Sequence, residues 1–109
     1  MSKTPEGDIQ KYGQEQLKKR GCLVRKISYE GRRGCPDMLV LVPSRAGKTI
    51  WEPKMPAVIF IELKKDENTE PEPHQVREHE RMRACGADVR VIGTRQQVDE
   101  LVQELFPCD

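Results

Sequence analysis

The chain has 109 residues, of which 36% are hydrophobic and 34% are charged, a composition typical of one small domain with a single core. No stretch approaches the roughly 18 apolar residues of a membrane span, and the N-terminus lacks the apolar segment of a secretion signal. We therefore expect one domain over residues 1–109, located in the cytoplasm and without membrane contact. Four cysteines without a Cys-x-x-Cys pair favour reduced thiols over a zinc site or a disulfide framework.

The net charge of +1 conceals two halves of opposite charge. Residues 1–65 contain 14 Lys and Arg against 7 Asp and Glu, whereas residues 66–109 contain 5 against 11. The basic clusters of the first half are Lys18–Arg20, Arg25–Lys26, Arg32–Arg33 and Lys64–Lys65. Such clusters favour contact with a phosphate backbone, although on charge alone a solvated surface is the simpler interpretation.

The first predicted element is a helix from Pro5 to about Arg20. Thr4 offers a capping hydroxyl, a proline at the first helical position fits the helix start, and Gly21 supplies the stop. At 100° per residue, the inward-facing stripe of this helix consists of Glu6, Ile9, Gly13 and Leu17. We therefore expect Glu6 on the inward side, near the start of the helix.

Three strands are predicted next. Residues 22–29 alternate as a strand, and residues 30–36, rich in glycine, form a turn-rich loop. Residues 37–42 form a short apolar strand. Two prolines exclude a regular central strand from 49–56, which we expect as a loop or a ragged hairpin edge. The most apolar stretch, 57–65, is expected as a fully buried central strand.

The second half alternates between helix and strand. An acidic loop over 66–73 precedes a helix over 74–86, and a strand over 87–93 precedes a closing helix over 94–105. By spacing, the inward positions of the first of these helices are Val76, His79 or Glu80, and Met82 or Arg83. The closing helix is capped by Thr94, and its apolar face consists of Val98, Leu101, Val102 and Leu105.

These elements give the order α-β-β-β-α-β-α. The stretch from residue 57 to residue 92 is a β-α-β unit, so its two strands are expected as parallel neighbours with the helix packed over them. The predicted fold class is an α/β sandwich around a mixed sheet.

Two carboxylates lie at the ends of predicted buried strands. Asp37 opens one strand, and Glu62 lies near the end of the other, where it shares a face with Lys64. If these strands are antiparallel neighbours, all three side chains meet at one edge. A salt bridge at a strand end is the ordinary explanation of so short a pattern. However, two adjacent carboxylates repel each other unless a cation lies between them.

Oxygen ligands favour Mg²⁺ or Mn²⁺, which take one or two carboxylates together with water and phosphate. A lysine beside such a metal can orient a water or stabilise charge at a phosphate, which suits phosphodiester hydrolysis. The basic side chains that border the glycine-rich loop are Lys26, Arg32 and Arg33, which either hold phosphates or form a solvated turn. His74 is a candidate contact at the edge of the site, whereas His79 is expected on the surface or in packing. Trp51 is expected as a core or interface anchor, with base stacking as the alternative.

Three short segments stand out by their order and spacing: Gly34-Cys35-Pro36-Asp37, Glu62-Leu63-Lys64 and His74-Gln75. With them the sequence resembles the virus-type replication-repair nuclease (VRR-NUC) family of the PD-(D/E)xK nuclease superfamily. Residues 21–26 and 87–101 are also similar to that family, so the resemblance covers nearly the whole chain.

The resemblance implies a restriction-endonuclease-like fold and Mg²⁺- or Mn²⁺-dependent cleavage of DNA. The catalytic residues that it implies are Asp37, Glu62, Lys64, Glu6 and Gln75. The metal ligands that the resemblance implies are Asp37, Glu62 and the backbone carbonyl of Leu63. The first-helix glutamate of the family maps best to Glu6, and Gln10 lies one turn further on. The candidate DNA contacts are then Lys26, Arg32, Arg33, Lys65 and His74.

A short member of this kind resembles phage and bacterial proteins that act as homodimers on branched DNA, similar to Holliday-junction resolvases. If phage-encoded, it would work in the cytoplasm of the host cell. Two alternatives stay open: a non-catalytic nucleic-acid-binding module of the same fold, and a nuclease acting on flaps or duplex ends. A small-molecule hydrolase is disfavoured, because the sequence has no glycine-rich phosphate loop and no nucleophile–base pair.

Overall fold

A computed structural model of the chain describes residues 5–43 and 58–107. Three helices and four strands follow one another as α1 (Pro5–Lys19), β1 (Leu23–Lys26), β2 (Met38–Leu41), β3 (Val58–Leu63), α2 (Pro73–Ala84), β4 (Asp88–Ile92) and α3 (Arg95–Leu105). This is the predicted order. The loop predicted over 49–56, its Trp51 and the capping Thr4 lie outside the described residues.

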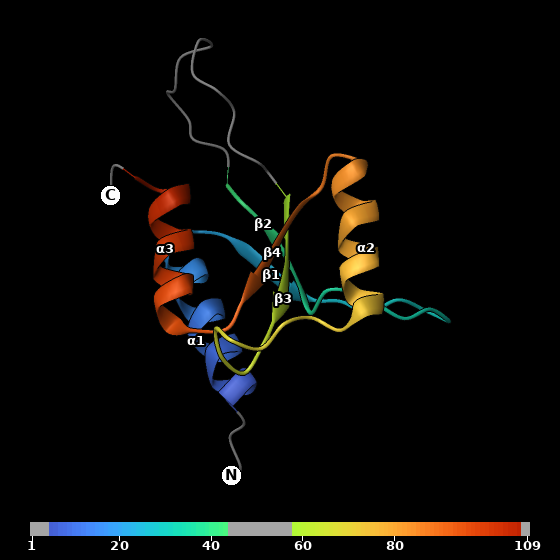
Figure 1. The fold of residues 1–109 in the computed structure, drawn as a ribbon. Helices are drawn as coiled ribbons and strands as arrows, with labels where there is room; N and C mark the ends of the chain where they lie inside the picture. Colours follow the sequence, from blue (N-terminus) through green and yellow to red (C-terminus); the bar gives the residue numbers. More distant parts are fainter. Residues whose placement is uncertain (1–4, 44–57, 108–109) are drawn as a thin grey trace.

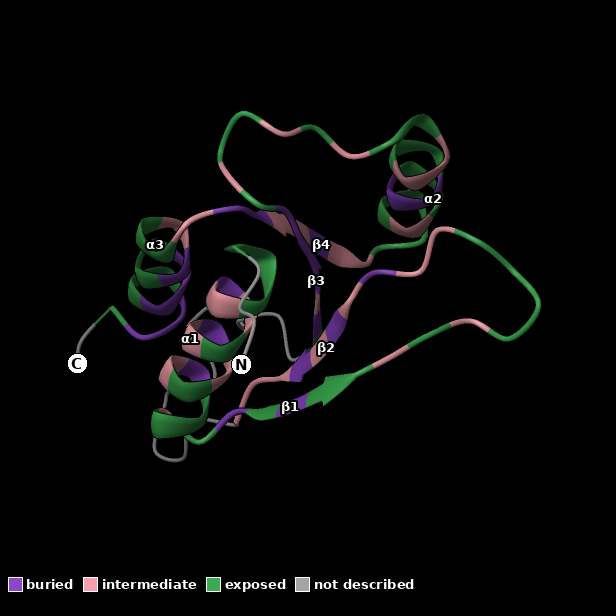
Figure 2. Cartoon of the chain, turned by 90° about the horizontal axis from the view of Figure 1, so that it is seen from below, coloured by how far each residue is buried: buried purple, intermediate pink, exposed green. Residues whose placement is uncertain are grey.

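The four strands form one mixed sheet in the order β1-β2-β3-β4. β2 is antiparallel to both β1 and β3, whereas β3 and β4 are parallel, as the β-α-β unit predicts. Helices α1 and α3 cover one face of the sheet, and α2 covers the other (Figures 1 and 2). The predicted α/β sandwich around a mixed sheet is confirmed.

The apolar core lies between the sheet and the pair α1 and α3. All four residues of the predicted apolar face of α3 are buried, and they meet the strand residues Met38, Val40, Ile59 and Ile61 in one cluster. The Thr94 hydroxyl oxygen accepts a hydrogen bond from the Gln97 N–H at 3.0 Å, so the predicted N-cap is also confirmed. This side of the molecule therefore folds by the apolar spacing that its sequence displays.

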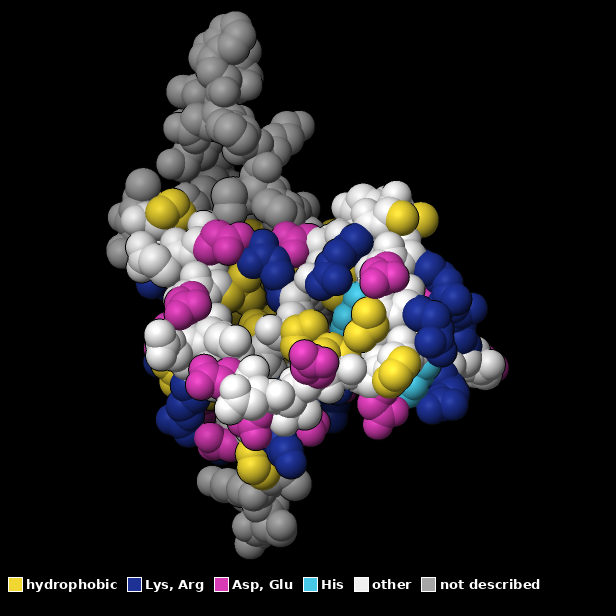
Figure 3. Space-filling model, viewed as in Figure 1, with side chains coloured by type: hydrophobic (Ala, Val, Ile, Leu, Met, Phe, Trp, Pro, Cys, Tyr) yellow, Lys and Arg dark blue, Asp and Glu magenta, His cyan; other side chains and the backbone are white. Residues whose placement is uncertain are grey.

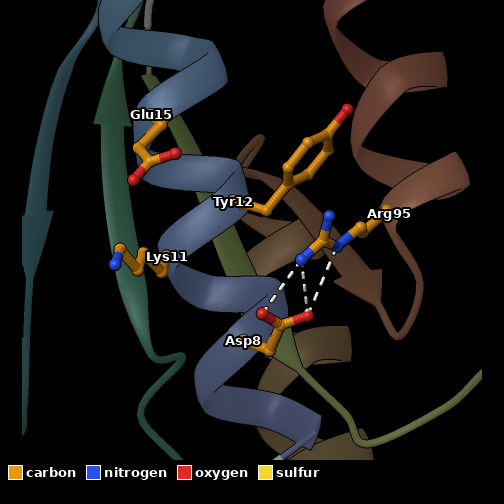
Figure 4. Close-up of a pocket in the computed structure, with 5 residues that line it drawn as sticks. All are labelled: Asp8, Lys11, Tyr12, Glu15 and Arg95. Atoms are coloured by element: carbon orange, nitrogen blue, oxygen red, sulfur yellow. Dashed lines mark hydrogen bonds and ion pairs between the residues drawn. The ribbon is translucent and has the colours of Figure 1, made fainter.

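Polar contacts on the outer side of this layer join α1 to α3. Asp8, Tyr12 and Arg95 line a hollow between the two helices with their charged neighbours Lys11 and Glu15 (Figure 4). The Arg95 guanidinium binds the Asp8 carboxylate at 2.9 Å and lies 4.9 Å from the centre of the Tyr12 ring. The contacts of Arg95 with Asp8 and Tyr12 therefore join the two helices across this hollow.

Three sequence expectations are wrong in detail. Glu6 is exposed, because the first turn of α1 extends past the strands (Figure 1) and the buried stripe starts at Ile9. The strand predicted over 22–29 ends at Lys26. Beyond it, the Ile27 N–H still donates a hydrogen bond to the carbonyl of Asp37, the residue before β2. Val76, expected to face inward, is 38% exposed.

Within residues 5–43 and 58–107, no helix has the length and apolar character needed to cross a membrane.

Candidate active site

The register of the central strands brings the two predicted carboxylates together. Met38 of β2 lies opposite Ile61 of β3, which places Asp37, one residue earlier, level with Glu62. The Asp37 Oδ2 accepts a hydrogen bond from the Leu63 N–H at 2.6 Å. Because the N–H and C=O of one strand residue point to the same edge, the Leu63 carbonyl also lies on the side of Asp37.

Glu62 is a buried carboxyl in an acidic environment. Glu62 is only 3% exposed, and its Oε1 has no hydrogen-bond partner among the described residues. Burial and the adjacent Asp37 raise the pKa of Glu62 to about 8, whereas Lys64 lowers it. The exposed Glu6 also raises this pKa, so the first turn of α1 contributes negative charge to the same region.

Gln75 links Lys64 to Glu62. The amide Oε1 of Gln75 accepts hydrogen bonds from the Lys64 ammonium at 2.8 Å and from the Glu72 N–H, which precedes α2, at 2.9 Å. Its Nε2 therefore faces the other way and donates to the Glu62 Oε2 at 3.1 Å. Lys64, 9% exposed, lies 4.0 Å from the same oxygen. The predicted set of Asp37, Glu62, Leu63, Lys64 and Gln75 thus forms one cluster.

The donor set of this cluster fits a divalent cation of the Mg²⁺ or Mn²⁺ type. Among the described residues, no three His, Cys, Asp or Glu side chains gather around one point, so the protein offers two carboxylates and a backbone carbonyl. Mg²⁺ binds in this way, through one or two carboxylates with water and phosphate completing its shell. A cation would also relieve the repulsion between Asp37 and Glu62 and provide a partner for the unpaired Glu62 Oε1.

The glycine-rich loop that delivers Asp37 is held against α2. Gly34 has a φ of +97°, and a Cβ at this position would lie 3.1 Å from the Cβ of Glu78. Glu78, a buried carboxylate, accepts hydrogen bonds from the Tyr29 hydroxyl at 2.6 Å and from Arg32 at 2.8 Å. These bonds lower the pKa of Glu78. We call Tyr29, Arg32, Gly34 and Glu78 the loop clamp.

The candidate DNA contacts are divided between the clamp and the surface. Arg32 belongs to the loop clamp, although its side chain remains 55% exposed. Arg33 is exposed, and its guanidinium lies 3.4 Å from the His74 Nδ1 at the start of α2. Lys26 and Lys65 are exposed at the ends of β1 and β3. Lys and Arg side chains gather beside α2 at the edge of the face seen in Figure 3.

His79 is a site residue that sequence reasoning missed. It is 2% exposed, and its Nε2 lies 3.4 Å from the Glu62 Oε1. Burial lowers its pKa, as do the positive charges of Arg83 and Lys64. A usable signal was present, because His79 follows Gln75 by four residues and therefore lies on the same face of α2.

Comparisons with known proteins identify the family and the fold. No family profile matches the sequence. A protein of Acyrthosiphon pisum secondary endosymbiont phage 1, named "Putative nuclease p44", is 36% identical over 90 residues, which cover 83% of this chain and 84% of that protein. A solved structure named "VRR_NUC domain" is 51% identical with a TM-score of 0.78, and the match covers 92% of this chain and 96% of the other. The implied restriction-endonuclease-like fold is thereby confirmed, and the chain belongs to the VRR-NUC family of nucleases.

Proposed function

We propose that this protein is a metal-dependent DNA endonuclease that hydrolyses phosphodiester bonds. The observation that carries the proposal is the meeting of Asp37 and Glu62 on neighbouring strands, with Lys64 attached to the same network through Gln75. Membership of a nuclease family supports this activity. A structural ion pair would not need two adjacent carboxylates, one of which keeps a buried oxygen without a hydrogen-bond partner in the part of the chain that the structure describes.

Asp37, Glu62 and the carbonyl of Leu63 are the proposed ligands of Mg²⁺ or Mn²⁺. When bound, such an ion polarises a phosphoryl oxygen and lowers the pKa of a coordinated water. Lys64 directs its ammonium group toward the phosphate, where it stabilises the negative charge that develops on the phosphoryl oxygens. Gln75 keeps Lys64 and Glu62 in fixed relative positions through its two hydrogen bonds. Glu6 adds a carboxylate at the solvent side of this region.

The substrate is held by the exposed basic side chains around the site. Lys26, Arg33, Lys65 and His74 are the proposed contacts to DNA phosphates, and Arg32 contributes through the exposed part of its guanidinium. Because such contacts release counterions, binding should weaken steeply as salt is raised. The proposed substrate is branched DNA such as a four-way junction, cut by a homodimer that presents two sites to two strands. This choice follows the resemblance to short phage and bacterial members of the family.

The test is cleavage of matched labelled substrates: duplex, single strand, flap and four-way junction. Each is incubated with Mg²⁺, Mn²⁺ or EDTA, with wild type and Asp37→Asn side by side. Metal-dependent cuts confined to the junction and absent from the variant would support the full proposal. Cuts in flaps or duplex ends would retain the nuclease and reject the junction preference. Binding without cleavage under every metal would instead indicate a non-catalytic nucleic-acid-binding module.

A further inference from the structure

His79 and Glu62 face each other inside the protein without another partner at the facing atoms. The His79 Nε2 and the Glu62 Oε1 lie 3.4 Å apart, and among the described residues they are the buried side-chain nitrogen and oxygen atoms that make no hydrogen bond. Both side chains are almost fully buried, at 2% and 3% exposure. Leaving two polar atoms unpaired in such a place is costly, whereas a small shift would join them by a hydrogen bond.

Two residues on one face of helix α2 lie next to the two carboxylate oxygens of Glu62. Gln75 donates to Oε2, and His79, four residues later, stands opposite Oε1. A carboxylate has about four lone-pair positions, so each oxygen that accepts one bond from α2 keeps a second lone pair for a cation. Two contacts at separate oxygens fix the rotation of the carboxylate, which a single contact would leave free.

Packing alone does not explain an imidazole at this position. An aliphatic side chain on α2 would fill the space next to Glu62 without bringing a second polar atom into the interior. His79 instead places a nitrogen directly against the carboxylate that lies level with Asp37. Groups of this kind, which touch a metal ligand and not the metal, orient the ligand and tune its affinity.

We propose that His79 is a positioning residue, which donates a hydrogen bond from Nε2 to the Glu62 Oε1 and thereby orients Glu62 toward the cation shared with Asp37. This inference rests on the proposed function, since it requires a metal at these two carboxylates. His79 contacts neither the metal nor the DNA in this arrangement. Its loss should therefore weaken metal binding while the fold is preserved.

The test measures Mn²⁺ binding to the DNA-free protein. Binding is monitored through the electron paramagnetic resonance signal of the Mn²⁺ that remains free. Three variants are compared with wild type: His79→Leu, His79→Gln and the control Glu80→Gln, which changes an exposed residue of the same helix. We expect His79→Leu to weaken Mn²⁺ binding about 10- to 100-fold, the range observed when such supporting contacts are removed. His79→Gln, whose amide N–H can replace Nε2–H, should restore binding to within about 3-fold of wild type. Glu80→Gln should bind as wild type.

The results that would overturn the inference differ in whether they also reject the metal site. Wild-type affinity in His79→Leu would reject the positioning role and leave the metal site intact. Absence of Mn²⁺ binding in wild type, or unchanged binding in Asp37→Asn, would reject the metal assignment and this inference with it. If His79→Leu does not fold, His79→Asn replaces it, because its shorter amide cannot reach Glu62. Equal affinity in His79→Asn and His79→Gln would then reject the positioning role.

Discussion

The two faces of the sheet are covered by helices that bury opposite kinds of side chain. α3, on the face shared with α1, buries Val98, Leu101, Val102 and Leu105, whereas the buried residues of α2 are Glu78 and His79. Figure 2 shows buried positions on the inner side of both helices. One face therefore supplies apolar burial, and the other supplies polar contacts that hold Glu62 and the loop before Asp37. The face covered by α1 and α3 therefore mainly stabilises the fold, and the face covered by α2 holds the residues of the proposed chemistry.

The largest effect on folding is expected on the α3 side, from Leu105→Ala. Leu105 is fully buried in the core cluster, and truncating such a leucine to alanine costs about 2–5 kcal/mol through lost burial and a residual cavity. Urea unfolding measures this loss. Below the unfolding transition, the cleavage rate per folded molecule should equal that of wild type. A lower rate would show that the two faces are coupled more tightly than their contacts indicate.

The pH dependence of stability should come from the α2 side, through Glu62. Its pKa of about 8 in the folded protein lies above its ordinary value of 4.5, so the folded state holds a proton that the unfolded state has released between these pH values. The metal-free protein should therefore lose stability as pH rises from about 5 to 8, by up to ~1.4 kcal/mol per pH unit from this group. Glu62→Gln should flatten the slope in urea titrations. An unchanged slope would mean that Glu62 titrates normally.

Gly34→Ala should damage both the fold and the site. A non-glycine residue with left-handed backbone costs roughly 1–2 kcal/mol, and the new Cβ would also press on Glu78 at 3.1 Å. Gly31→Ala is the matched control, because Gly31 also has a positive φ of +68° but no atom of the described residues lies within 4 Å of the added Cβ. Both variants should lower the melting temperature, and only Gly34→Ala should also lower the cleavage rate. Equal cleavage in the two variants would argue against the loop clamp as a positioning device for Asp37.

Tyr29→Phe is the smallest change on the α2 side. It removes one hydrogen bond to the buried Glu78, which keeps its bond from Arg32, so a loss of about 1 kcal/mol is expected. Tyr12→Phe removes a bond of the same length, 2.6 Å, to the exposed Asp99 on the other side of the molecule, and should cost less. Urea unfolding of the two variants compares them directly. A larger loss from Tyr12→Phe would reverse the ranking of the two contacts.

The sequence was most informative where burial is apolar. The spacing of α3, its Thr94 cap and the parallel pairing of β3 with β4 were predicted and are confirmed. The antiparallel pairing of β2 with β3, on which the meeting of the two carboxylates depended, is also found. Periodicity succeeds there because the inward residues are hydrophobic and their period is that of the helix. The same pairings brought Asp37 level with Glu62, so the centre of the candidate site followed from topology.

The same reasoning succeeded only in part on α2, because the inward face of this helix is polar. Helical spacing placed Val76 and either His79 or Glu80 inward; His79 is buried, whereas Val76 is 38% exposed and the buried Glu78 was not among the expected inward positions. Arg32 stays a proposed contact to DNA phosphates, but its bond to Glu78 joins residues 46 positions apart, and no local sequence pattern reveals such a contact. Glu6 was expected on the inward side from its helical spacing. This expectation was wrong, because spacing does not show where a helix passes the edge of the sheet. These misses concentrate around the functional site, where polar groups occupy positions that apolar residues fill elsewhere.

The most direct test of the division between the two faces is one variant measured in two ways. Asp37→Asn keeps an oxygen that can accept the Leu63 N–H bond, and it removes the charge that repels Glu62. Single-turnover cleavage with Mn²⁺ should fall by more than about 100-fold, because a lost ligand costs more than a lost supporting contact. The melting temperature of the same metal-free protein should stay equal or rise. Retained cleavage, or a large drop in melting temperature, would contradict the assignment of Asp37 to the chemistry of the site.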